Sequence, residues 1–194
     1  MKTRKWLIIS VVLLIGIIVG VGINRTVSGN SSTRYSYVQP RHTNKNARRV
    51  FINASMNRNG NTSKLAQKLF GKQSYRQINL RDYNIPQLGQ GNGDFDKVWQ
   101  QIKGADVIVI GTPVYWSNMS GYLKTFIDHM QVNNDLKGSD LYVIVQGQSS
   151  NQTAAINSTY GTLNRIAKRF GMHFVGIGQT NHQVQNLHNK MIGK

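Results

Sequence analysis

The 194-residue chain contains no cysteine and no glutamate, and each absence removes a class of chemistry. Without cysteine there is no disulfide, no thiolate-bound zinc and no cysteine nucleophile. Without glutamate there is no paired-glutamate chemistry, because all seven acidic residues are aspartates. The patterns G-x-x-x-x-G-K-[ST], G-x-G-x-x-G and G-x-S-x-G are also absent. Their absence argues against a nucleotide P-loop, a dinucleotide-binding fingerprint and a hydrolase nucleophile elbow.

Acidic residues are scarce beside basic ones, with 24 Lys and Arg against seven Asp and a net charge of +17. Residues 1–49 carry nine basic residues and no acid, whereas residues 50–194 carry fifteen basic and seven acidic residues, or +8. This balance favours anionic partners such as phosphate-bearing cofactors, anionic lipid or wall polymers, and nucleic acid. The length suits one domain with an appendage.

The N-terminal stretch Trp6–Ile23 has no charge and follows Lys2, Arg4 and Lys5. As a helix it would span about 27 Å, close to the hydrocarbon thickness of a bilayer. A cleaved signal peptide is the alternative, but no A-x-A-like cleavage site follows the apolar run. We therefore expect residues 1–23 to be one uncleaved transmembrane helix that anchors the protein in the cell membrane.

Basic residues flank this segment on both sides, and they are closer together on its N-terminal side. This asymmetry favours a cytoplasmic N-terminus and an extracytoplasmic domain. Residues 24–49 are rich in Ser, Asn, Thr and Arg, with few larger apolar groups. This composition predicts a basic, disordered tether, so that the folded domain is expected over residues 50–194.

From residue 50 onward, apolar runs alternate with segments of helical periodicity, which predicts a parallel sheet with helices on both faces. Helices are expected over about 63–70, 95–102, 123–130 and 156–170, and only weakly in the last stretch. The five expected strands are Val50–Ala54, Tyr75–Leu80, Asp106–Gly111, Leu141–Val145 and His173–Ile177. Ligands in such folds bind beyond the carboxyl ends of the strands.

The loop after the first expected strand combines hydroxyl, amide and glycine residues at the start of a helix. Free amides and the helix dipole favour an anion there, and glycine permits close approach of the backbone. An ordinary loop with a Ser or Thr helix cap explains the same residues, so both interpretations stay open. The residues concerned are Ser55, Asn57, Asn59, Gly60, Asn61, Thr62 and Ser63.

Two stretches of the chain resemble the flavodoxin-like NAD(P)H-dependent FMN reductases and quinone reductases. ASMNRNGNTSKLAQKLF is similar to that family's S-P-R-x-x-G-N-T phosphate loop and first helix. GTPVYWSNMSGYLKTFIDHM is similar to its S-P-x-Y-W-G-x-x-S-x-x-L-K-x-F-I-D signature. The likeness covers most of residues 50–178. It implies an α/β fold of the flavodoxin-like type: a doubly wound five-stranded parallel sheet with helices on both faces.

The resemblance implies that FMN is the cofactor and NAD(P)H the co-substrate. A hydride would pass from NAD(P)H to FMN N5, and the electrons then to a quinone, a flavin or a similar small-molecule acceptor. No side-chain base is needed, so no catalytic residue is assigned, and the spacing of the histidines predicts no metal site. The phosphate would bind at Ser55, Asn57, Asn61 and Thr62, and the flavin ring between Gln146–Gly147 and the loop of Pro113, Val114, Tyr115, Trp116, Asn118 and Met119.

The chain departs from the family pattern within both of these stretches and in the loop after the fourth expected strand, which reads Gln-Gly-Gln-Ser. Met56 and Asn57 replace the Pro and Arg of the phosphate loop, although Arg58 could replace the lost charge, and Ser117 replaces a Gly. These departures and the basic charge motivate a rival hypothesis. In it the domain is a non-catalytic flavodoxin-like module that binds anionic wall polymer, lipid or nucleic acid. Under the enzyme hypothesis a homodimer is one option for assembly, and a nucleic-acid partner is not expected.

Overall fold

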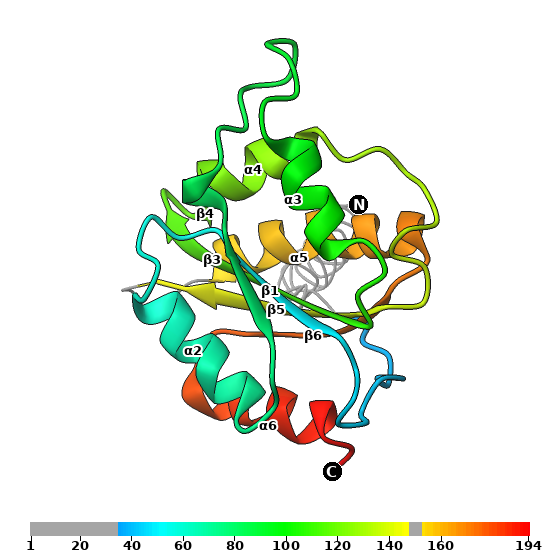
Figure 1. The fold of residues 1–194 in the computed structure, drawn as a ribbon. Coiled ribbons are helices and arrows are strands. Elements are labelled where there is room, and N and C mark those ends of the chain that lie inside the picture. The colour runs from blue at the N-terminus through cyan, green and yellow to red at the C-terminus, as the bar shows by residue number, and fades with distance from the viewer. Residues whose placement is uncertain (1–34, 148–152) are drawn as a thin grey trace, which may run out of the picture. The chain divides into compact units, whose positions relative to one another are not determined.

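Six strands form one sheet at the centre of the domain (Figure 1). The computed structural model describes residues 35–147 and 153–194. Five strands are parallel and follow the order β2-β1-β3-β5-β6, while β4 pairs antiparallel with β3. The strands are β1 (Arg49–Asn53), β2 (Arg76–Asn79), β3 (Val107–Tyr115), β4 (Asn118–Met119), β5 (Asp140–Gln146) and β6 (His173–Gly178).

The five predicted parallel strands are confirmed, but the prediction of a five-stranded sheet is wrong by one strand. The additional strand β4 has two residues, which is too short for an alternating pattern to appear in the sequence. It forms because β3 runs four residues beyond its predicted end at Gly111 and turns back on itself.

Helices cover both faces of the sheet, as the alternating pattern predicts. In β1 the alternate side chains Val50 and Ile52 pack beneath α3, α4 and α5, whereas Phe51 packs beneath α2 and α6. Figure 1 shows α2 and α6 together on one face. The helices are α2 (Asn61–Phe70), α3 (Phe95–Ile102), α4 (Gly121–Asp128), α5 (Thr153–Phe170) and α6 (Asn181–Met191), with a short 3-10 turn η1 (Leu80–Asp82).

The C-terminal helix α6 is better formed than its weak apolar pattern predicts. Thr180 accepts a hydrogen bond from the amide of Gln183, and the Gln183 side chain accepts one from the amide of Thr180. This reciprocal pair is a capping box, which satisfies two amides that have no partner inside the helix. The T-x-x-Q spacing was therefore a usable signal in the sequence.

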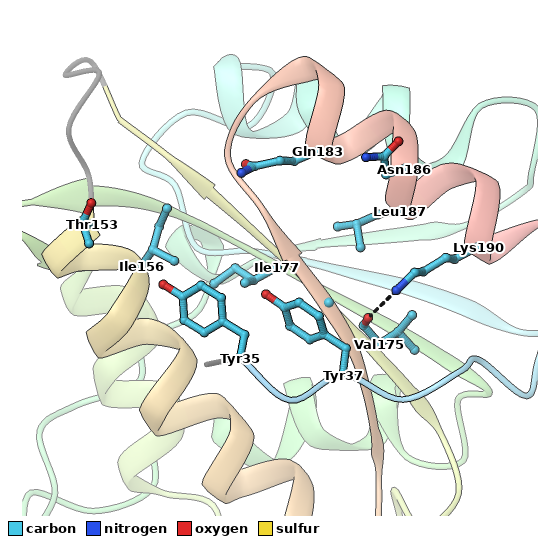
Figure 2. A pocket seen from close by; sticks show the side chains of 11 residues that line it. Tyr35, Tyr37, Thr153, Ile156, Val175, Ile177, Gln183, Asn186, Leu187 and Lys190 are labelled. Carbon is cyan, nitrogen blue, oxygen red and sulfur yellow. Dashed lines mark hydrogen bonds between the residues drawn. The ribbon is translucent and has the colours of Figure 1, made fainter. Parts of the chain in front are cut away.

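The second half of the predicted tether is folded onto the domain, so the prediction of disorder is wrong for residues 35–49. Tyr35–Lys194 form one unit. The amide of Val38 donates to the carbonyl of Phe174 in β6, at 3.0 Å, and the Tyr37 ring stacks on Phe174. Figure 2 shows Tyr35 and Tyr37 over β6, between α5 and α6. Burial raises the pKa of Tyr37 to about 12, so its hydroxyl stays protonated at neutral pH.

A buried carboxylate holds the next part of this segment. Asp140 has no exposed surface and accepts hydrogen bonds from the amides of Arg41 and His42 at 2.8–3.0 Å. These partners are about a hundred residues apart in sequence, so local composition gave no sign of the contact. We call residues 35–48 the N-terminal strap.

The remaining predictions about the N-terminus concern residues that the structure does not describe. The expected membrane helix over residues 1–23 and the first part of the tether, residues 24–34, lie outside the described residues. Within the described residues, no helix is both long enough and apolar enough to cross a membrane.

Candidate functional site

The loops after β1 and β3 lie side by side at the carboxyl edge of the sheet. The strand order reverses at β1 and β3, because β1 leads to β2 on one side while β3 lies on the other. Asn53 pairs in register with Gly111, and the amide of Ala54 donates to the carbonyl of Gly111 at 2.8 Å. Such a reversal of strand order is where parallel sheets bind ligands.

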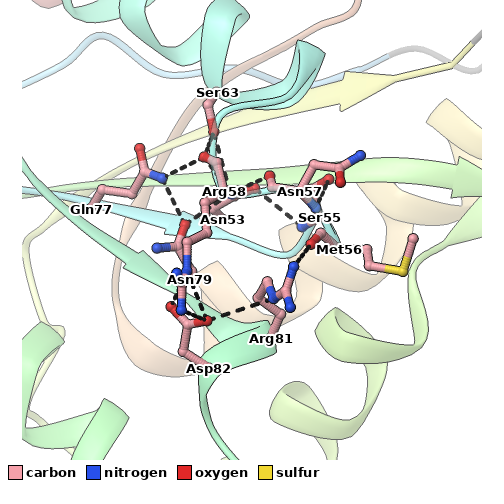
Figure 3. A network of polar contacts seen from close by, with 10 residues as sticks. All are labelled: Asn53, Ser55, Met56, Asn57, Arg58, Ser63, Gln77, Asn79, Arg81 and Asp82. Atoms are coloured by element: carbon pink, nitrogen blue, oxygen red, sulfur yellow. Dashed lines mark hydrogen bonds and ion pairs between the residues drawn. The ribbon is translucent and has the colours of Figure 1, made fainter.

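The first loop is organised by the buried side chain of Asn53 (Figure 3). Its oxygen accepts a hydrogen bond from the amide of Ser55 at 3.1 Å. Its nitrogen lies 3.0–3.3 Å from four acceptors, so its two N–H groups are shared among them. Asn53 thus ties the loop to α2 and to the neighbouring strand β2. The acceptors are the carbonyls of Asn57 and Arg58, the Ser63 hydroxyl and the Asn79 side-chain oxygen. The sequence prediction missed this residue, although a lone polar residue inside an apolar strand is a signal.

The four residues predicted to bind phosphate lie together where α2 begins, but they differ in burial. Ser55 is buried, and its hydroxyl accepts a hydrogen bond from the amide of Asn57 at 3.1 Å. Thr62 is also buried, with its methyl group packed against Gly111. The side chains of Asn57 and Asn61 are exposed. The Ser55 hydroxyl therefore helps to build the loop, and the two amide side chains are available to a ligand.

The N-terminus of α2 has the properties of an anion seat. Its cap residue, Gly60, supplies no side-chain hydrogen bond, and the first turn of the helix has no acidic residue. The first amides of a helix have no acceptor inside it. They therefore present donors and the positive end of the helix dipole at the surface of the loop.

Arg58 does not take the place of the arginine that is missing from the phosphate loop. Its guanidinium forms a bidentate ion pair with the carboxylate of Asp82, with N–O distances of 2.8–3.0 Å. The hydrogen bonds from Arg58 lower the pKa of the Asp82 carboxyl, and the same pair raises the pKa of the guanidinium. The nearby Arg81 donates to the carbonyl of Met56 at 2.6 Å. Both arginines stabilise the loop from its outer side.

The second predicted loop, Pro113–Met119, is a β-hairpin made by β3 and β4. Its two turn residues, Trp116 and Ser117, have φ values of 49° and 60°. This left-handed region strains any residue other than glycine, and a bulky one most of all. Ser117 is the position at which the resembling family has glycine. The turn leaves the Trp116 side chain fully exposed.

The other predicted residues of the hairpin divide between its inner and outer sides. Pro113 and Met119 are buried, Val114 is half-buried, and Tyr115 is half exposed. The side-chain oxygen of Asn118 accepts hydrogen bonds from the amide of Met119 and from Ser158 of α5, at 2.8 and 3.0 Å. The Met119 amide is therefore already paired with the Asn118 side chain.

Two buried hydroxyls hold the hairpin against the first loop. The Ser120 hydroxyl donates to the carbonyl of Ala54 at 2.8 Å and caps α4 through the amide of Leu123. The amide of Ser120 donates to the hydroxyl of Thr112 at 3.0 Å. The sequence prediction gave these two residues no role. Their contacts show that the loops after β1 and β3 are one connected structure.

Four of the predicted site residues line two cavities near the carboxyl edge of the sheet. One has a volume of about 440 Å³ and includes Asn61, Gln146 and Gly147. The other has a volume of about 550 Å³ and includes Met56 and Tyr115. Gln146 and Gly147 are both half-buried, where β5 ends. The residues that follow them in the chain, Gln148 and Ser149, lie outside the described residues.

Known proteins share both sequence and fold with this chain. The sequence model of the NADPH-dependent FMN reductases matches residues 47–184. A putative NAD(P)H-dependent FMN-containing oxidoreductase of Bacillus subtilis is 33% identical over 87 residues, which are 40% of this chain and 48% of that protein. The match thus spans about half the length of that curated relative.

Solved structures of other proteins have the same fold. The Trp repressor binding protein of Bacillus subtilis has a TM-score of 0.58 and 23% identity, over 74% of this chain and 96% of that one. An NADH:FMN oxidoreductase in its apo form has a TM-score of 0.57 and 20% identity, over 75% and 86%. An FMN-dependent NADH-azoreductase of Bacillus anthracis in complex with FMN has a TM-score of 0.54 and 16% identity, over 75% and 96%. At these identities the likeness concerns the fold alone.

Proposed function

This chain belongs to the NADPH-dependent FMN reductase family, and from this membership we propose that it is an oxidoreductase that takes electrons from NAD(P)H through FMN to a small-molecule acceptor. The observation that carries the proposal is the acid-free, uncapped N-terminus of α2 beside the Asn53-ordered loop. An FMN phosphate fits this position, because it supplies the acceptors and the negative charge that these amides lack.

The residues of this chain would bind and orient the cofactor. The first amides of α2, with Asn57, Asn61 and Thr62, would hold the phosphate, and Ser55 would keep the loop in shape. The exposed rings of Tyr115 and Trp116 would form one wall for the flavin, with Gln146 and Gly147 on the opposite side. When bound, FMN supplies hydride acceptance and electron release. The protein therefore needs only to position the reactants and exclude water.

The acceptor in this proposal is a planar molecule such as a quinone or a flavin. The cavity of about 550 Å³ beside the hairpin suits it, because Tyr115, Tyr122 and Met56 line it. Flat conjugated ligands favour aromatic and apolar walls.

An interface between two copies of the chain would cover the same exposed side chains. Light scattering on the purified protein distinguishes a monomer from a dimer.

Attachment to the cell membrane is part of the proposal and rests on the sequence alone. The support is the uncharged run Trp6–Ile23 and the basic cluster before it, which favours an extracytoplasmic domain. Protease added to intact cells should then cut the protein. Protection in intact cells, with cutting only after lysis, would reverse the orientation, and a full-length protein that is soluble without detergent would contradict the anchor.

The test of the enzyme proposal is a flavin titration of the full-length protein in detergent. We expect FMN to bind at least about tenfold more tightly than riboflavin or FAD, because one terminal phosphate fits the start of α2. Equal affinity for riboflavin would contradict the phosphate seat. Electron transfer is then measured as NAD(P)H oxidation with a quinone.

Substitutions of Thr62 separate the phosphate contact from packing. Thr62→Val keeps the methyl group that packs on Gly111 but removes the hydroxyl, whereas Thr62→Ser keeps the hydroxyl. We expect Thr62→Val to weaken FMN binding by about 1–3 kcal/mol and Thr62→Ser to weaken it less. Riboflavin affinity should be equal in both variants.

One observation favours the rival binding module. The only arginine in the first loop, Arg58, is engaged by Asp82, so the loop has no free guanidinium for a phosphate. In this alternative the basic surface binds an anionic polymer or lipid. A colourless protein that gains no flavin absorbance with added FMN would favour this alternative over the enzyme.

A further inference from the structure

A cavity of about 440 Å³ lies over the outer edge of β6, between α5 and α6 (Figure 2). We call it the edge cavity, and its lining includes Tyr35 and Tyr37 of the strap, Ile177 of β6, and Leu187 and Lys190 of α6. Its volume is in the range usual for small-molecule sites. It shares no lining residue with the two cavities of the candidate flavin site, and β5 separates β6 from β3 in the sheet. The edge cavity is therefore a separate site.

The two tyrosine rings that form one wall of the edge cavity are held in place by contacts behind them. The Tyr35 hydroxyl donates to the side-chain oxygen of Asn157, and its ring lies 4.6 Å from the Tyr160 ring, measured between centroids. The Tyr37 ring stacks on Phe174, with 12° between the two planes. A ligand therefore meets an aromatic wall that is already formed, which lowers the entropy cost of binding.

The outer edge of β6 is covered, which argues against a peptide strand as the occupant. The strap pairs with the start of β6 through the amide of Val38. Further along, the Tyr37 hydroxyl interacts with the backbone of Ile177, and the Lys190 ammonium lies 3.5 Å from the carbonyl of Val175. A peptide that added a strand to this edge would displace these groups. The cavity therefore suits a small ligand.

The polar groups of the edge cavity favour an anion. Lys190 is half-buried, and none of the seven aspartates, which all lie within the described residues, forms an ion pair with it. Its contact with the Val175 carbonyl is long, so the three N–H groups of the ammonium are not used up. The Gln183 side-chain oxygen accepts within the capping box, which leaves its NH2 group as a donor. No acidic side chain lines the cavity.

We propose that the edge cavity binds a small aromatic carboxylate, with the carboxylate on Lys190 and the ring against Tyr35 and Tyr37. Aromatic and aliphatic walls favour a flat ring, and an ammonium and a carboxylate form a charge-assisted hydrogen bond. The Lys190 ammonium lies 5.6 Å from the centroid of the Tyr37 ring, so one ligand can contact both groups. The bound ligand would join the strap to α6. This inference does not depend on flavin binding.

The test is a calorimetric titration of the full-length protein in detergent with 2-naphthoate, an aromatic carboxylate, and with its neutral analogue 2-naphthamide. We expect the wild type to bind the carboxylate at least about tenfold more tightly than the amide. Lys190→Met keeps the aliphatic stem and removes the charge, so the two probes should bind equally. Lys190→Arg keeps the charge and should keep most of the preference. The matched control is Lys168→Met, which removes a charge from an exposed position of α5 outside the cavity and should keep the preference.

Three results would overturn the inference. They are absent or equal binding of the two probes by the wild type, an unchanged preference in Lys190→Met, and a loss of the preference in Lys168→Met, which would assign it to the overall basic charge. A second titration in saturating FMN separates the edge cavity from the flavin site. The affinity for 2-naphthoate should stay the same, and competition between FMN and 2-naphthoate would contradict a separate site. Failure of the wild type to bind FMN would contradict the proposed function alone.

Discussion

The side chain of Asn53 joins three parts of the candidate phosphate site. It is fully buried at the end of β1, and it contacts the first loop, the start of α2 and strand β2. A buried polar group that loses its partner costs more than an average hydrogen bond gains. The shape of the first loop therefore depends more on the side-chain amide of Asn53 than on the exposed asparagines Asn57 and Asn61, which the sequence analysis predicted as phosphate ligands.

Replacing Asn53 by alanine should destabilise the protein and weaken FMN binding together. The amide of Ser55 would lose its acceptor, and the loop would lose its link to β2. We expect the free energy of unfolding to fall by about 1–3 kcal/mol, as measured by urea denaturation. Asn57→Ala is the control for stability, because its exposed side chain should change the free energy by less than about 0.5 kcal/mol. Unchanged FMN affinity in Asn53→Ala would show that the loop keeps its shape without the amide.

Among the elements, the β3–β4 hairpin stores strain where the proposed site needs an exposed aromatic surface. Both turn residues have positive φ, and neither is glycine. Ser120 and Thr112 hold the base of the hairpin, and Asn118 holds its outer strand to α5. These contacts keep the backbone in a conformation that the turn residues alone disfavour.

Ser117→Gly should relieve part of this strain. Glycine adopts a φ of 60° without a steric cost, although its flexible unfolded state offsets part of the gain. We expect the free energy of unfolding to rise by about 0.5–1 kcal/mol, seen as a higher urea midpoint with the same slope. Ser117→Ala is the control, because alanine keeps the Cβ atom. If glycine and alanine have the same effect, the turn is not strained at this position.

The capping box of α6 should also have a measurable effect. Thr180→Ala removes the side-chain acceptor for the amide of Gln183. We expect a loss of about 1 kcal/mol in the free energy of unfolding. Thr180→Ser keeps the hydroxyl and should recover most of this loss. A Thr180→Ser variant as unstable as Thr180→Ala would mean that packing, and not the cap, explains the effect.

At the scale of the whole molecule, the N-terminal strap (residues 35–48) packs against β6, which is an edge strand of the sheet. It covers β6 through Tyr37 and Val38 and leads into β1 at Arg49, whose guanidinium donates to carbonyls of the strap. The carboxylate of Asp140 is its central attachment, because it accepts hydrogen bonds from two consecutive strap amides. The domain therefore includes about fifteen residues whose composition resembles that of a linker.

Asp140→Asn should loosen the strap. Both carboxylate oxygens of Asp140 accept hydrogen bonds from the backbone amides of Arg41 and His42. The asparagine side chain has only one acceptor oxygen, and its NH2 group cannot accept from a backbone amide. We expect trypsin to cut after Arg41 and Lys45 several times faster than in the wild type, as followed by mass spectrometry of the fragments. Asp96→Asn removes the same charge from an exposed position on α3 and should leave the cutting rate unchanged. Equal rates in all three proteins would show that Asp140 does not hold the strap.

The sequence by itself was enough to predict the parallel α/β sheet, its helices and the family. Apolar runs of strand length and helical periodicity are local patterns, and burial on both faces of a parallel sheet makes them strong. The two family motifs are also continuous stretches, so all the predicted site residues except Gln146 and Gly147 could be named from them. The capping box of α6 was also present in the sequence, as the T-x-x-Q spacing of Thr180 and Gln183.

Only the tertiary structure decided how the strap folds, which partner Arg58 takes, and how the turn of the β3–β4 hairpin is strained. It also decided that Lys68 lies beside Asn181 at the start of α6, more than a hundred residues away in sequence. Each of these features depends on a contact between residues that are distant in the chain or on a turn forced into a disfavoured conformation. Local preferences carry no information on such contacts, because packing and buried hydrogen bonds form only when distant segments meet.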